Sequence, residues 1–270
     1  MISFKQIVDF YLRSSIHVAL SVYSLVRMTQ FMFNISVDEP MANFAFLGTM
    51  VGYNFVKYDA LARAKKKLMR KELKLIALLS FFALIGVGYF FFQLQFYTQI
   101  IAIVFLALTL LYTLPFFPNR KNARNWAGVK IYIVALCWVG VTLVLPLINA
   151  GVPMGADFYL KCVQRFILVF NLILVFEIID LAQDDPHLHT VPQQIGVKNT
   201  KIVGLLLLFP FYLLEFLKHH FVQEQLMVNG ILVLILALFL AFANEKRSKY
   251  YTSFWVECIP IFWWLLVVFF

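Results

Sequence analysis

Residues 159–181 read YLKCVQRFILVFNLILVFEIIDL, and this stretch decides the class of fold. An apolar run of about 20 residues is the length that an α-helix needs to cross the hydrocarbon layer of a bilayer. Basic residues stand toward the start of the run, at Lys161 and Arg165, and acids stand toward its end, at Glu177 and Asp180. The stretch therefore predicts a membrane-spanning helix with charged groups toward both ends.

The composition of the whole chain agrees with this reading. Of 270 residues, 62% are hydrophobic and 14% are charged, and the mean hydropathy is +0.83. A soluble domain has roughly 45–50% apolar and about 25% charged residues. The apolar surplus is too large for one soluble core, because core size is bounded by the ratio of surface to volume. We therefore expect an integral membrane protein in which residues 1–270 form a single transmembrane domain.

Reading the chain in windows of about 20 apolar residues predicts an all-α, polytopic membrane helix bundle of about nine transmembrane helices. The first two of these spans are the least hydrophobic. The predicted spans are Ser14–Phe33, Met41–Tyr58, Leu73–Phe92, Phe96–Phe116, Ala127–Asn149, Tyr159–Leu181, Lys201–Leu217, Leu226–Ala243 and Ser253–Phe270.

The orientation of the bundle follows from its basic residues. With the N-terminus in the cytoplasm and the C-terminus outside it, nineteen of the 23 lysine and arginine residues fall in or beside cytoplasmic loops. This asymmetry is the usual insertion bias of membrane proteins, and we expect a bacterial inner membrane. The net charge of +9 therefore needs no nucleic-acid partner. The basic run 63–71 either faces lipid headgroups or attracts an anionic substrate.

Three carboxylates at the end of the sixth span are the strongest local signal for chemistry. Glu177, Asp180 and Asp184 are spaced by three and four residues, so a helix places them on one face. Ionised acids at membrane depth are costly and tend to mark function. A bound Mg²⁺ would neutralise them and would complete its coordination with substrate phosphates. The alternative is that the three acids lie in water beyond the helix end and pair with lysine or arginine.

The residues that follow strengthen this signal. Asp185-Pro186 ends the helix, because a residue before proline is pushed out of the α region. We expect Thr190–Gly196 to form a structured turn that leads into the seventh span. His187 and His189 flank this turn, as surface histidines or in a metal or proton-transfer role.

These motifs resemble those of the UbiA superfamily of intramembrane prenyltransferases. That family has nine helices and two aspartate-rich motifs, and its second motif reads roughly D-x-x-x-D followed by T-x-P-x-x-x-G. This chain has Asp180-x-x-x-Asp184, then Thr190-x-Pro192-x-x-x-Gly196. The segment 111–121, LYTLPFFPNRK, is similar to the Y-S-x-P-P-x-R-x-K segment that follows the fourth helix of the family.

The chain departs from the family in the first motif. The family has N-D-x-x-D-x-x-x-D after the second helix, and this chain has Asn54 followed by Phe55, with Tyr58 at the next aspartate position. Asp59 lies off that face and could pair with Arg63, four residues on. Two explanations stay open. Lys57 and Arg63 could hold a diphosphate directly in place of a second metal ion, or the protein keeps the fold and has lost or changed the reaction.

The resemblance implies transfer of an isoprenyl group from its diphosphate to an aromatic or lipid acceptor, with Mg²⁺ as cofactor. It implies that Asp180 and Asp184, helped by Glu177, hold the metal and that Asn54 holds the diphosphate. The competing hypothesis is a non-catalytic or repurposed lipid-binding membrane protein on the same fold. The further substrate-binding residues implied are Lys57, Tyr58, Arg63, Tyr112, Arg120, Lys121 and Arg124.

Isolated polar residues inside the predicted spans should face the interior of the bundle. They include His17 and Arg27 in the first span and Asn171 in the sixth. Arg27 lies about 14 residues into its span, or ~20 Å at 1.5 Å per residue. At that depth it is far from Glu177, so we expect a structural or snorkelling role.

Overall fold

A computed structural model describes residues 3–64, 71–114, 128–185, 188–219 and 222–270, except the side chains of residues 59–64. Helices make up the regular structure of this part of the chain. In chain order they are α1 (Phe4–Arg13), α2 (Ile16–Met32), α3 (Glu39–Ala64), α4 (Lys71–Phe91), α5 (Phe96–Thr113), α6 (Val129–Val139), the π-helix η3 (Gly140–Val144), α7 (Leu145–Asn149), α8 (Ala156–Asp180), α9 (Val191–Leu213), the 3₁₀-helix η5 (Leu214–Leu217), α10 (Gln223–Phe242), the π-helix η6 (Tyr251–Val256) and α11 (Ile259–Phe269).

The predicted polytopic helical membrane bundle is confirmed. Within the described ranges, seven helical segments are long and apolar enough to cross a membrane. Helices α2 and α3, which match the two least hydrophobic predicted spans, are not among the seven, and α2 has only 17 residues. The seven segments are Lys71–Phe91, Phe96–Thr113, Val129–Asn149, Ala156–Asp180, Val191–Leu217, Gln223–Phe242 and Tyr251–Phe269.

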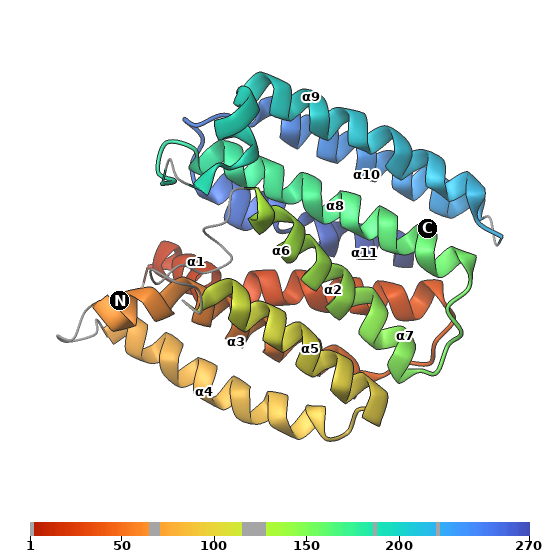
Figure 1. The fold of residues 1–270 in the computed structure, drawn as a ribbon, viewed down its shortest axis with the longest axis horizontal. Coiled ribbons are helices and arrows are strands. Elements are labelled where there is room, and N and C mark those ends of the chain that lie inside the picture. The colour runs from red at the N-terminus through yellow and green to blue at the C-terminus, as the bar shows by residue number, and fades with distance from the viewer. Residues whose placement is uncertain (1–2, 65–70, 115–127, 186–187, 220–221) are drawn as a thin grey trace.

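Two helices, α2 and α8, form the middle of the bundle (Figure 1). In the most apolar 18-residue stretch of α8, 72% is buried inside the bundle. The corresponding share for α4, at the edge of the bundle, is 11%. On α4 the rings of Phe81 and Phe82 are exposed. Because so many large apolar side chains point outward, the outer surface of α4 suits contact with lipid tails rather than water.

The helices run back and forth, so their ends gather at two ends of the bundle (Figure 1). We call one of these the basic end, where α5, α8 and α10 finish and α6, α9 and η6 begin. Lys130, Lys198, Lys246 and Lys249 lie there. We call the other one the far end. The predicted site residues that the structure describes are at or near the basic end.

Helix α1 was not predicted. It is short and strongly amphipathic, so a search for apolar runs passes over it. Ser3 and Gln6 cap its start with reciprocal side-chain to backbone hydrogen bonds. The hydroxyl of Tyr250 donates a hydrogen bond to the carboxylate of Asp9, and this bond is the chief reason that the pKa of Tyr250 is raised. Helix α1 is thereby tied to the loop between α10 and η6.

The start of α9 also differs from the prediction. The expected turn over Thr190–Gly196 is already helical, because Thr190 and Gln193 form a capping box and Pro192 lies in the first turn. Gly196 then interrupts the helix with a φ of 79°. An L-residue rarely adopts this backbone conformation, so the glycine allows the kink.

The isolated polar residues behave largely as expected. His17 and Asn171 are buried in the bundle. Arg27 forms an ion pair with Glu39, with its Nη1 2.6 Å from Oε1. This ion pair joins α2 to α3, which fits a structural role for Arg27.

Candidate functional site

Glu177 lies in the last turn of α8 and is 3% exposed. One of its carboxylate oxygens, Oε2, accepts a hydrogen bond from the backbone N–H of Val191 at 3.0 Å. Val191 is the first residue of α9, whose first N–H groups have no partner within the helix. Glu177 therefore joins the end of α8 to the start of α9.

Asp180 and Asp184 lie one turn further on. Asp180 is the last residue of α8, and its carbonyl accepts hydrogen bonds from the N–H groups of Gln183 and Asp184, so the chain keeps turning beyond the helix. Both carboxylates are partly buried, and they repel each other. The Oδ2 atom of Asp184 is buried, and no group in the described residues donates a hydrogen bond to it. An unmet buried acceptor of this kind costs about 1–3 kcal/mol, and more when it is charged.

The described cations that act on this pair come from two other elements. Asp180 interacts electrostatically with Lys130, at the start of α6, and with Lys249, before η6. Neither lysine forms a direct ion pair with it. The pair is therefore partly screened by positive charge at the basic end, but its charge is not neutralised by direct contact within the described part of the chain.

The predicted three-carboxylate metal site is assembled only in part. Among the residues that the structure describes, no group of three His, Cys, Asp or Glu side chains is placed to hold a metal ion. The physical reason is that Glu177 points to the backbone of α9. Asp180 and Asp184 remain as a pair, and the unmet Oδ2 of Asp184 is the kind of oxygen that a hard cation such as Mg²⁺ binds.

The residues of the first motif point to the junction of α1 and α2. Asn54 Nδ2 donates to the carbonyl of Ser14 at 3.0 Å and to a hydroxyl of α4. Lys57 Nζ donates to the Ser15 hydroxyl at 3.0 Å, and Tyr58 donates to a carbonyl of the same junction at 2.9 Å. These contacts hold α3 against the junction. Asn54 Oδ1 has no hydrogen-bond partner among the described residues, and Lys57 uses one of its three donors in the Ser15 bond.

The other predicted substrate-binding residues are only partly visible. Tyr112 is buried at the end of α5, within electrostatic range of Tyr53, whose hydroxyl accepts a hydrogen bond from Trp138 at 2.8 Å. Arg63 lies in α3, and its side chain is outside the described part. Three further predicted residues lie outside the described residues altogether, namely Arg120, Lys121 and Arg124.

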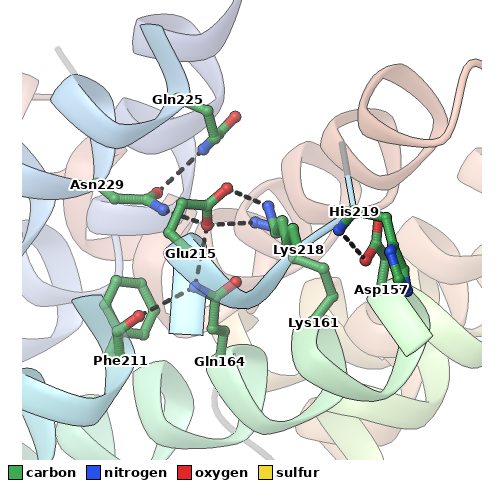
Figure 2. Close-up of polar contacts among 9 residues, drawn as sticks. All are labelled: Asp157, Lys161, Gln164, Phe211, Glu215, Lys218, His219, Gln225 and Asn229. Atoms are coloured by element: carbon green, nitrogen blue, oxygen red, sulfur yellow. Dashed lines mark hydrogen bonds and ion pairs between the residues drawn. The ribbon is translucent and has the colours of Figure 1, made fainter. Parts of the chain in front are cut away.

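A second polar cluster, at the far end, was not predicted (Figure 2). Glu215 of η5 is its centre and is fully buried. Its Oε2 accepts hydrogen bonds from Lys161 at 3.2 Å, from Gln164 at 3.0 Å and from Asn229 at 2.7 Å. Its Oε1 accepts one from Lys218. Four donors from α8, α10 and the chain after η5 therefore converge on one carboxylate.

This far-end cluster has a structural rather than a chemical character. Both oxygens of Glu215 are used, and the side chains of Lys161 and Glu215 are 4% and 1% exposed. Individual signals for it exist in the sequence, since Lys161, Glu215 and Asn229 interrupt apolar runs. Their pairing could not be predicted, because the residues are more than one helix apart and only tertiary packing brings them together.

Arg165 is a third buried polar group, in the middle of α8 and 2% exposed. Its guanidinium donates to the hydroxyl of Thr142 at 2.9 Å and, at 3.3 Å, to Thr29 and to the carbonyl of Leu25. It also lies over the ring of Trp263, 5.5 Å from the centroid. Arg165 joins α2, η3, α8 and α11 through neutral acceptors, so its charge is not balanced by a direct ion pair in the described structure.

Comparison of the chain with protein families, with curated proteins and with solved structures finds no match.

Proposed function

We propose that this chain is a UbiA-like intramembrane prenyltransferase, which transfers an isoprenyl group from its diphosphate to an aromatic or lipid acceptor. The proposal includes nine membrane crossings, with α2 and α3 added to the seven apolar segments. It also includes a cytoplasmic basic end and N-terminus, an extracytoplasmic C-terminus and a bacterial inner membrane. The positive-inside bias of the loops supports this orientation.

The observation that carries the proposal is the carboxylate pair at the basic end. Asp180 and Asp184 repel each other, and one buried oxygen of Asp184 has no hydrogen-bond donor among the described residues. A cation bound between them would meet that oxygen and reduce the repulsion. Mg²⁺, when bound there with a diphosphate, would stabilise the negative charge that grows on the leaving group.

The residues around the pair would bind and orient the substrate. Lys130 and Lys249 supply positive charge close to Asp180, which favours an anionic group at this end of the bundle. Glu177 would act as a positioning residue, because it fixes the first turn of α9 beside α8. The apolar and aromatic helix faces would hold the isoprenyl tail and exclude water.

A direct binding measurement tests the proposal. Purified full-length protein is titrated with farnesyl or geranylgeranyl diphosphate, with Mg²⁺ or with a chelator. We expect Mg²⁺-dependent binding that is lost when Asp180→Asn and Asp184→Asn are combined. Asp157→Asn is the matched control, since it removes a carboxylate from the other end of the same helix. Binding that ignores Mg²⁺, or that survives the double substitution, removes the proposed site.

A non-catalytic lipid-binding protein on the same fold is the second candidate. One observation favours it: Asn54, Lys57 and Tyr58 each donate a hydrogen bond to the junction of α1 and α2, so those donors are not available to a diphosphate. This candidate predicts retention of lipid by the purified protein, with no Mg²⁺-dependent affinity for an isoprenyl diphosphate.

A further inference from the structure

A groove of about 280 Å³ runs between α9 and α10, on the side of these helices that faces away from the bundle core. Leu208 forms its buried floor, at 3% exposed, and Leu205 and Phe209 form its exposed rim, at 40% and 68%. The groove is apolar along its length. Its lining residues are Leu205, Leu208, Phe209, Tyr212, Val233 and Ala237.

A cation stands at one end of this groove. Lys201 precedes Leu205 by one helical turn and lies on the same face of α9. On α10, Ala241 stands one turn beyond Ala237, and its carbonyl accepts a hydrogen bond from Lys201 Nζ at 2.8 Å. An ammonium group has three donors, so Lys201 keeps two for another partner.

The groove runs along α9 from Leu205 to Tyr212, about 10 Å at 1.5 Å per residue, and together with Lys201 at its head it spans about the depth of one leaflet. From Lys201 to Tyr212 the helix rises over eleven residues, or about 17 Å at 1.5 Å per residue. Half of the ~30 Å hydrocarbon layer is about 15 Å. At the inner limit of the groove the ring of Tyr212 lies close to Gly230, where a Cβ would meet it at 3.6 Å. The site thus begins with Lys201 on the side of the basic end, and its groove closes near the depth at which a leaflet ends.

Further positive charge surrounds the head of the groove. Lys198 is exposed and lies one turn before Lys201 on α9. Arg247 Nε donates to the carbonyl of Phe242 at 3.2 Å, next to the carbonyl that Lys201 binds. The loop 244–250 contains three basic residues and one acid, Glu245. Lys249 lies within electrostatic range of Asp180, but Lys246 and Arg247 alone still outnumber Glu245, so the head is net positive.

We propose that this groove is a binding site for one anionic phospholipid of the leaflet at the basic end. Its phosphate would lie at Lys198 and Lys201, and one acyl chain would lie along the floor formed by Leu208. Any lipid can cover an apolar helix face, but cations at the head of the groove select a negatively charged headgroup. The site shares no residue with the carboxylate pair, so it stands whether or not the proposed transferase activity does.

Native mass spectrometry of the full-length protein tests this site. The protein is released from detergent in an equimolar mixture of phosphatidylglycerol and phosphatidylcholine with identical chains. We expect selective retention of one phosphatidylglycerol. Each lysine near a membrane surface contributes about fivefold in affinity for an anionic lipid. Lys198→Gln should therefore lower the preference about fivefold, and adding Lys201→Gln should lower it about 25-fold.

Matched controls separate the head from the groove. Ala237→Phe fills the groove and should lower retention of both lipids, whereas Leu238→Phe changes an exposed neighbour outside the lining and should not. Lys74→Gln removes an exposed lysine of α4 and should leave the preference unchanged. Equal retention of the two lipids by the unmodified protein overturns the proposal, as does an unchanged preference in Lys198→Gln. Displacement of the lipid by inorganic phosphate at equal concentration also overturns it, because the acyl chain would then contribute nothing.

Discussion

Replacing Glu215 by glutamine tests the buried cluster at the far end. In the native protein one carboxylate faces two ammonium groups, those of Lys161 and Lys218, and it also accepts hydrogen bonds from two amides. Glu215→Gln keeps the size of the side chain and removes its charge. Two buried cations would then face each other without a direct counter-charge.

The cost follows from the stoichiometry of the cluster. Removing one partner of a buried ion pair destabilises a protein by about 3–5 kcal/mol, because the other charge stays buried and unpaired. Glu215→Gln should fall in this range, because one of the two lysines can give up its proton and thereby limit the cost. Lys161→Met is the matched control. It leaves Glu215 with Lys218 and two amide donors and relieves the repulsion between the two lysines, so it should cost less than ~1 kcal/mol.

The assay is unfolding of the purified full-length protein in mixed micelles titrated with sodium dodecyl sulfate, followed by circular dichroism. Free energies of unfolding come from linear extrapolation. The decisive quantity is the difference between the two variants. If Lys161→Met costs as much as Glu215→Gln, or if Glu215→Gln costs less than ~1 kcal/mol, the reasoning from net buried charge is refuted.

Three further substitutions test other parts of the bundle in the same assay. Arg165→Met should leave the free energy of unfolding unchanged or raise it by about 1–3 kcal/mol, because it removes a buried cation that has no direct ion pair. The hydroxyls of Thr29 and Thr142 keep hydrogen bonds of their own to backbone carbonyls. A loss above ~2 kcal/mol would contradict this prediction. Gly196→Ala should cost about 1–3 kcal/mol, since a φ of 79° with a ψ of 158° is a conformation that essentially only glycine adopts. An equal or greater stability would show that the kink straightens at no cost. Tyr58→Phe should cost about 0.6 kcal/mol, the mean value of a side-chain hydrogen bond in a membrane protein. If Tyr58 bound substrate instead, affinity would fall and stability would not.

Most of the helices could be predicted because an apolar run and a bilayer share a length scale. The apolar run at 73–92 needs only lipid around it to form a helix, and α4 indeed covers Lys71–Phe91. Helix α1 and the first turn of α9 escaped this criterion. Both depend on side-chain caps, at Ser3 and Thr190, and on polar faces, which a hydropathy window averages away.

The candidate site could be predicted only to the level of residue type and helix face. The spacing of Glu177, Asp180 and Asp184 correctly puts Glu177 and Asp180 in the last turn of one helix, whereas Asp184 lies in the turn that follows it. The spacing could not reveal that the N–H of Val191 donates a hydrogen bond to Glu177, because that contact depends on where α9 begins. In the same way, Asn54 matches a family motif by position, but its side chain donates a hydrogen bond to the carbonyl of Ser14 at the junction of α1 and α2.

Helix α8 has carboxylates at its basic end and the hydrogen-bond donors of a carboxylate, Glu215, toward its far end. Comparing how the carboxylates at the two ends are satisfied indicates where a ligand could bind. At the far end Glu215 receives four hydrogen bonds, two of them from cations, so the protein itself satisfies the carboxylate. At the basic end Asp180 and Asp184 repel each other, and a buried oxygen of Asp184 has no donor among the described residues. Buried polar groups are normally satisfied by the protein, by water or by a ligand. A satisfied carboxylate contributes to the fold, whereas an unsatisfied one has capacity left for a bound cation. The basic end of α8 is therefore where a ligand should be sought first.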